Sequence, residues 1–201
     1  PEAEKIYVGK ADRLHILEQD SINQLLLKKA REDKVVVRLK GGDPFVLGRG
    51  GEEAAILTRH GIPFEVVPGV TSASAVPAYA GIPVTHREVA SSFAVITGHK
   101  ASDRGEPRIF WDKLATGADT LVILMGMRNL AKIVDELIKH GRPPSSPVAV
   151  ITHGTTKLQR CVTGTLEDIL AKAISENLQP PSVVVVGDVV HLRNYLRWFD
   201  K

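Results

Sequence analysis

The chain has one cysteine, few aromatic residues and no long apolar run. Because Cys161 stands alone among 201 residues, an intrachain disulfide is excluded and the sequence suits a reducing compartment. No stretch approaches the length of a membrane span, and the N-terminus lacks the charged-then-apolar pattern of a signal peptide. We therefore expect a soluble, cytoplasmic protein that makes no membrane contact.

An excess of charge of one sign is also missing. The 26 basic and 23 acidic residues leave a net charge of only +3, and no long basic run occurs. This pattern argues against nucleic acid as a partner. The 7 histidines are scattered without the spacing of metal ligands, so no metal site is predicted. With 43% hydrophobic residues, the chain can form one large or two small α/β domains.

A glycine-rich connection is the most distinctive stretch of the sequence. The β-branched run 35–37 predicts a strand covered on both faces, and it leads into Gly-Gly-Asp-Pro at 41–44. Such a turn can simply reverse the chain, with Asp43 accepting hydrogen bonds from nearby amides. A second glycine-rich turn follows at 48–51, and two such turns exceed what a reversal needs. Since ligands of open α/β sheets bind at the carboxyl ends of strands, the first turn is a candidate binding site.

Strand and helix patterns alternate along the rest of the chain. Apolar spacing predicts helices at 20–30, 52–60, 73–80, 130–138, 166–174 and 192–199, and strands at 6–8, 64–67, 93–97, 120–125, 148–151, 158–163 and 183–186. The polar, Pro- and Gly-bearing stretch 81–92 predicts a linker, which divides the chain into lobes 1–88 and 89–201.

Two stretches of the sequence, one of which is the glycine-rich connection, resemble the signature of a known family. LKGGDPFVLGRGGEE at 39–53 and IPFEVVPGVTSASAVPAYAGIPVTHR at 62–87 closely resemble the signature of uroporphyrinogen-III C-methyltransferases, which are S-adenosylmethionine (SAM)-dependent tetrapyrrole methylases. The resemblance extends from Ile6 to Phe199. It implies an α/β fold of two lobes, each with a mostly parallel sheet, and an active site in the cleft between them. It also implies a homodimer.

The activity implied by this resemblance is methylation of uroporphyrinogen III at C2 and C7. The product would be precorrin-2, an intermediate of sirohaem and cobalamin biosynthesis, and SAM would leave as S-adenosylhomocysteine (SAH). Residues that match SAM-binding positions of the family are Gly41, Gly42, Asp43, Val46, Thr71, Ser72, Met125 and Gly154.

Each of these residues also has an ordinary structural interpretation. Thr71 and Ser72 can cap a helix, Met125 can fill a core, and Gly154 can form a turn. By similarity, Lys10 matches the proton donor, although a solvated lysine is the ordinary interpretation.

Three basic residues are candidates for contact with substrate carboxylates: Arg49, His86 and Arg87. Such basic side chains are also common on protein surfaces. The family's chains begin earlier, with a GxGPGDP-type loop and an aspartate assigned as proton acceptor. Neither is present in this sequence, so we expect the chain to lack part of the site.

Three other functions remain open from the sequence. The acceptor could be a later corrin-ring intermediate, or the chain could be a non-catalytic binding or oligomerisation fragment. A nicotinamide-binding domain is the third, although GxGxxG with an acidic residue at the expected distance is missing.

Overall fold

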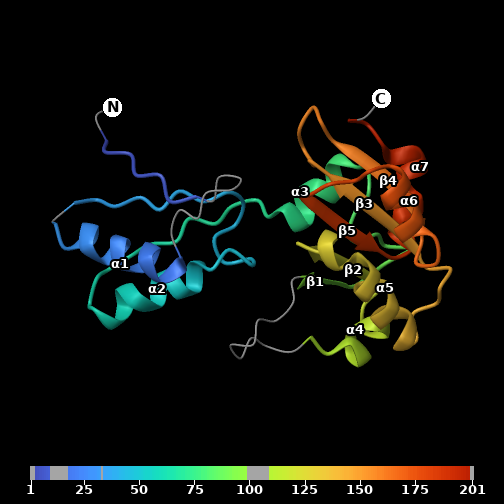
Figure 1. Ribbon diagram of the computed structural model, residues 1–201, viewed down its shortest axis with the longest axis horizontal. Coiled ribbons are helices and arrows are strands. Elements are labelled where there is room, and N and C mark those ends of the chain that lie inside the picture. The colour runs from blue at the N-terminus through green and yellow to red at the C-terminus, as the bar shows by residue number, and fades with distance from the viewer. Residues whose placement is uncertain (1–2, 10–17, 33, 99–108, 200–201) are drawn as a thin grey trace. The chain divides into compact units, whose positions relative to one another are not determined.

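The computed structural model describes residues 3–9, 18–32, 34–98 and 109–199 (Figure 1). The chain forms two compact units, Pro1–Gly69 and Val70–Lys201. The sequence places the lobe boundary after residue 88, whereas the contacts divide the chain at residue 69. The reason is that helix α3 (Ser72–Tyr79) packs against strands of the second unit. The functional boundary at 88 stays a prediction.

The first unit contains a pair of helices, α1 (Gln19–Ala30) and α2 (Gly50–Arg59), which pack against each other. Both confirm helices expected from the sequence. The strands predicted at 6–8, 35–37 and 64–67 are wrong, because no described residue of this unit belongs to a strand. Val35 is 96% exposed and Val37 is 79% exposed. A strand needs a neighbour to pair its N–H and C=O groups, and a local apolar run does not specify that neighbour.

The second unit is built on a five-stranded sheet, which has the order β1-β2-β5-β3-β4. Its strands are β1 (Phe93–Thr97), β2 (Thr120–Leu124), β3 (Pro147–Thr152), β4 (Arg160–Thr165) and β5 (Ser182–Val186). Only β1 and β2 pair in parallel, while the other three pairings are antiparallel. The expected mostly parallel sheet is therefore corrected to a mixed one. Apolar runs indicate which strands are buried but not which way they run.

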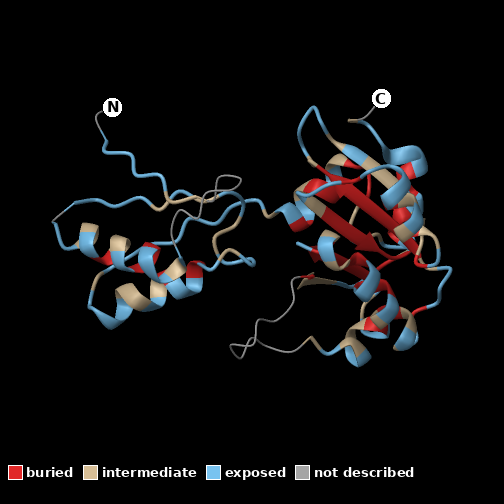
Figure 2. Ribbon diagram, in the orientation of Figure 1, coloured by how far each residue is buried: buried red, intermediate tan, exposed pale blue. Residues whose placement is uncertain are grey.

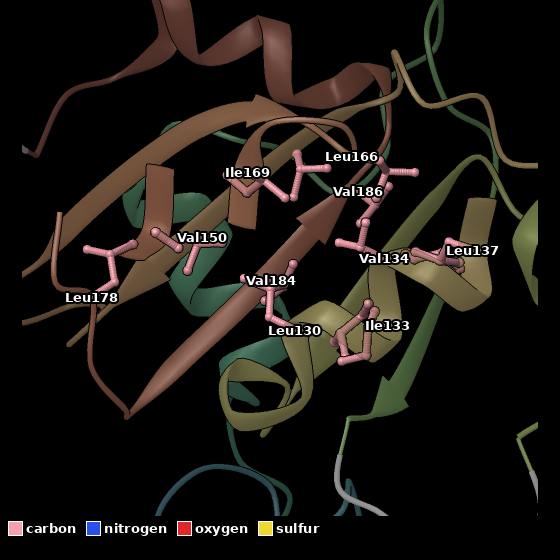
Figure 3. Close-up of a cluster of buried hydrophobic side chains, with 14 of the residues drawn as sticks. Leu130, Ile133, Val134, Leu137, Val150, Leu166, Ile169, Leu178, Val184 and Val186 are labelled. Atoms are coloured by element: carbon pink, nitrogen blue, oxygen red, sulfur yellow. The ribbon is translucent and has the colours of Figure 1, made fainter. Parts of the chain in front are cut away.

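Helices cover both faces of this sheet. On one face, α5 (Leu130–Lys139) and α6 (Ile169–Ser175) pack over the core cluster drawn in Figure 3, which includes Leu137, Val150 and Val184. On the other face, α3 and the 3₁₀ helix η2 (Asp188–Leu192) pack over Val183 and Val185. Figure 2 shows the central strands buried between these layers. The loops that carry the candidate residues of this unit therefore extend from a buried sheet.

Two helices of this unit differ from those that the sequence predicts. Helix α4 (Trp111–Gly117) was not predicted, because only Ala115 of its residues is buried and it shows no strong apolar period. The terminal helix expected at 192–199 is the short α7 (Arg193–Leu196), which follows η2.

Arg142 connects α4 and the residues after it to the rest of the second unit. Substituting Arg142 tests how much this connection stabilises the unit. Its guanidinium donates hydrogen bonds to the backbone carbonyls of Ala115 (3.1 Å), Ala118 (2.8 Å) and Asp119 (2.6 Å). Burial lowers the pKa of Arg142, although nearby Asp188 and Asp119 oppose this effect. We expect Arg142→Met to lower the free energy of unfolding by about 2 kcal/mol, because these carbonyls lose their donor. Urea denaturation measures this change in the free energy of unfolding, with Arg128→Met, at an exposed arginine, as the control. Equal losses of stability in the two variants would contradict the role of the three carbonyls.

Candidate functional site

In the first unit, the loop 41–46 is held by the carboxylate of Asp43. Its Oδ1 accepts hydrogen bonds from the amides of Phe45 (2.8 Å) and Val46 (3.0 Å), and its Oδ2 accepts one from Gly69 (3.1 Å). The hydrogen bonds from Gly69, Phe45 and Val46, in that order, lower the pKa of Asp43. The carboxylate is therefore ionised at neutral pH, and the interpretation of Asp43 as a turn residue is confirmed.

The two glycines before Asp43 leave this loop open to a ligand. Gly42 has a φ of 77°, in the region that favours glycine, and a Cβ on Gly41 would meet nothing within 4 Å. By contrast, a Cβ on Gly69 would collide with the carbonyl oxygen of Gly42. The loop is thus packed closely on the Gly69 side while the backbone of Gly41 is accessible.

Arg49 lies in the second glycine turn, immediately before α2, and its guanidinium is bound by a residue of that helix. It donates hydrogen bonds to both carboxylate oxygens of Glu52, at 2.8 and 2.7 Å. The hydrogen bond from Arg49 lowers the pKa of Glu52. A substrate carboxylate at Arg49 would therefore compete with Glu52. Val46, the other candidate of this loop, is 37% exposed.

In the second unit, the carboxyl ends of β2 and β3 lie at the same end of the sheet. Both strands run antiparallel to β5, which lies between them. Met125 follows β2 and is 52% exposed, with a φ of 57°. His153 and Thr155 follow β3, with φ values of 48° and 67°. Left-handed backbone is uncommon for residues other than glycine, and it costs most at a β-branched residue such as Thr155; such strained residues cluster at binding sites. The sequence identified Met125 and Gly154 as candidates but did not predict this backbone conformation.

Helix α3 packs directly against the loop after β3. A Cβ on Gly154 would overlap the Cγ methyl groups of Val76 on α3. Thr71 caps this helix, since its Oγ1 accepts a hydrogen bond from the amide of Ala73 at 3.2 Å. The capping interpretation of Thr71 is therefore confirmed, and Ser72 is the exposed first residue of the helix. Gly154 therefore packs against the same helix that begins at Thr71 and Ser72.

The remaining candidates are less well defined by contacts. His86 and Ala90 form an isolated β-bridge, and Nδ1 of His86 accepts a hydrogen bond from the amide of Glu88 at 3.3 Å. Arg87 is exposed in the same turn. Lys10, the candidate proton donor, lies outside the described residues.

Residues 3–9, 18–32, 34–98 and 109–199 contain neither a metal-binding cluster nor a membrane-spanning helix. No group of three or more His, Cys, Asp and Glu residues there could hold a metal ion. No helix in that part of the chain is long and apolar enough to cross a bilayer.

Comparison with known proteins gives consistent matches over most of the chain. The model of the family described as Tetrapyrrole (Corrin/Porphyrin) Methylases matches residues 2–170. The uroporphyrinogen-III C-methyltransferase of Methanocaldococcus jannaschii is 57% identical over 192 residues, which cover 95% of this chain and 78% of that protein. The enzyme of the same name from Priestia megaterium is 52% identical over 190 residues, covering 94% of this chain and 79% of that protein.

Solved structures agree with these matches. The uroporphyrin-III C-methyl transferase of Thermus thermophilus, complexed with S-adenosylhomocysteine, is 40% identical and superposes with a TM-score of 0.79. The match covers 95% of this chain and 80% of that one. A cobalt precorrin-4 methyltransferase, 24% identical with a TM-score of 0.75, shares the fold over 87% of this chain and 72% of its own.

Proposed function

Because the chain belongs to the tetrapyrrole (corrin/porphyrin) methylase family, we propose that it is a SAM-dependent uroporphyrinogen-III C-methyltransferase. The reaction transfers one methyl group to C2 and one to C7 of uroporphyrinogen III from two molecules of SAM, and it yields precorrin-2 and two molecules of SAH. The observation that carries this proposal is the 57% identity to an enzyme of that name, over 95% of the chain. A relative complexed with SAH supports the choice of cofactor.

The described residues fit a role in holding SAM. The accessible backbone of Gly41 and the left-handed turn at Gly42 allow close approach of a ligand. Asp43 fixes the loop that carries them, through its three amide hydrogen bonds. In the second unit, the exposed Met125 offers a side chain after β2, and Gly154 follows β3 at the same end of the sheet. We assign Val46, Thr71 and Ser72 to the same function.

Bound SAM supplies an electrophilic methyl group on its sulfonium. A pyrrole carbon is already nucleophilic, so the task of the protein is to align the substrate and to manage one proton. We assign Arg49, His86 and Arg87 to substrate carboxylates, since an arginine binds a carboxylate through two hydrogen bonds. Lys10 is assigned as the proton donor. We further propose that the chain acts as a homodimer in the cytoplasm, which light scattering and cell fractionation would test.

Calorimetric titration of SAH into the chain tests the cofactor assignment first. We expect saturable binding with one SAH per chain, and absence of binding would contradict the proposal. Transfer of a labelled methyl group from SAM to uroporphyrinogen III then tests the acceptor, with dimethylation detected by mass spectrometry. Transfer only to a later corrin-ring intermediate would identify a different methylase of the same fold. Binding of SAH without any transfer would identify a binding fragment.

A further inference from the structure

Glu53 is a buried carboxylate that is not among the candidate site residues. It lies in the first turn of α2 and its residue is only 5% exposed. Its Oε1 accepts hydrogen bonds from Nε of Arg38 (3.1 Å) and Nε2 of Gln19 (3.2 Å). Its Oε2 accepts one from Nζ of Lys40 (3.0 Å). One side chain on α2 therefore joins α1 to the segment that enters the glycine loop.

The ionisation of Glu53 depends on these partners. Burial raises its pKa, but the hydrogen bonds from Lys40 and Gln19 and the charges of Arg38 and Lys40 together lower it below the usual value. Removing charged groups from water is unfavourable, and a buried ion pair often adds little to stability. The buried ion pairs of Glu53 therefore indicate a role beyond stability alone.

That explanation lies in where Lys40 is placed. Lys40 immediately precedes Gly41, and its side chain is 13% exposed. After the two glycines, Asp43 is fixed by Phe45, Val46 and Gly69. Two consecutive glycines have more backbone freedom than any other pair of residues. The flexible pair is thus anchored on both sides, by Lys40 before it and by Asp43 after it.

Helix α2 contributes to both anchors. The amide of Gly50, its first residue, donates a hydrogen bond to the carbonyl of Pro44 at 3.0 Å, on the far side of the glycines. Glu53, one turn later, holds Lys40 on the near side. The start of this helix therefore sets the distance between the two ends of the loop.

We propose that Glu53 is a positioning residue for SAM, which holds the Gly41–Gly42 backbone in its binding conformation through Lys40. This inference rests on the proposed function. Glu53→Gln is expected to weaken SAH binding about tenfold, because the lost charge–charge contact loosens the entry to the loop. Amide hydrogen exchange in peptides covering 39–46 should become faster. Calorimetry and mass spectrometry measure the two effects.

A second variant separates positioning from simple stability. Glu53→Gln leaves the cation of Lys40 buried without its charged partner, which lowers stability. Glu53→Gln/Lys40→Met also removes the more buried of the two cations that face Glu53, while Arg38 stays with its second acceptor, the carbonyl of Leu39 (2.9 Å). Its unfolding midpoint in urea should therefore return part of the way to that of the unsubstituted chain. Its SAH affinity should stay low and its exchange at 39–46 should stay fast. Recovery of the affinity together with the stability would overturn the inference.

Glu32→Gln is the matched control. Glu32 also pairs with two lysines in the first unit, Lys29 at 3.4 Å and Lys34 at 2.7 Å, and neither of these partners belongs to the glycine loop. Its SAH affinity should equal that of the unsubstituted chain. Equal affinities of the unsubstituted chain and Glu53→Gln would overturn this inference alone. Failure of the unsubstituted chain to bind SAH would overturn the proposed function and this inference with it.

Discussion

Asp43→Ala is expected to lower the affinity for SAH about 100-fold, because three amide hydrogen bonds that shape the loop depend on one carboxylate. Without them, the amides of Phe45 and Val46 no longer fix the turn, and Gly69 loses its contact with the loop. All three hydrogen bonds join Asp43 to backbone amides, so we expect the loss to come from the conformation of the loop. Calorimetric titration with SAH measures it.

Asp43→Asn is the informative comparison. An asparagine can keep its carbonyl oxygen toward Phe45 and Val46, but its amide group then faces the N–H of Gly69, and two donors cannot pair. We therefore expect an intermediate affinity, nearer that of the unsubstituted chain than that of Asp43→Ala. Urea denaturation of all three proteins shows whether they are folded at the titration temperature. An unchanged affinity in Asp43→Ala, with the protein folded, would mean that SAM does not bind at this loop.

The elements that sequence predicts well are those whose signal is local. The five residues of β2 are all buried, and the unbroken apolar run 121–124 is visible in the sequence. Helix α5 buries Leu130, Ile133, Val134 and Leu137, which recur at helical spacing. The segment 35–37 carries an equally clear apolar run, yet it forms no strand, because pairing depends on residues far away in the chain. The direction of β5 between β2 and β3 is nonlocal for the same reason.

The candidate site likewise contains local features, which the sequence predicts, and nonlocal ones, which it does not. The motif at 41–44 predicts the glycine turn and its aspartate, since turn chemistry is contained within a few residues. Glu53 was missed because its partners come from different segments: Lys40 is 13 residues away, Arg38 is 15 away and Gln19 is 34 away. Only the folded chain brings them together. In the same way, the need for glycine at 154 arises from Val76 on another element.

Gly154→Ala is expected to destabilise the second unit by about 3 kcal/mol, because the new methyl group would overlap both Cγ methyls of Val76. Val76 is 7% exposed on α3, which packs against β2 and β5, so it has little room to move. Displacement of α3 would also disturb its capped start at Thr71. We therefore expect SAH affinity to fall at least about tenfold, and urea denaturation and calorimetry measure the two effects.

The double variant Gly154→Ala/Val76→Ala shows whether this collision is the cause. Val76→Ala alone removes two buried methyl groups and lowers stability by leaving a cavity. In the double variant, the methyl group at 154 enters the space that the Cγ atoms leave, with the Cβ of residue 76 at 3.0 Å as the nearest remaining contact. The two changes should therefore be less destabilising together than the sum of their separate effects. Simple additivity would contradict a steric role for Gly154 and would assign its importance to the backbone of the loop after β3. If the double variant recovers stability but not SAH affinity, the bare backbone at 154 contacts the cofactor, in addition to making room for α3.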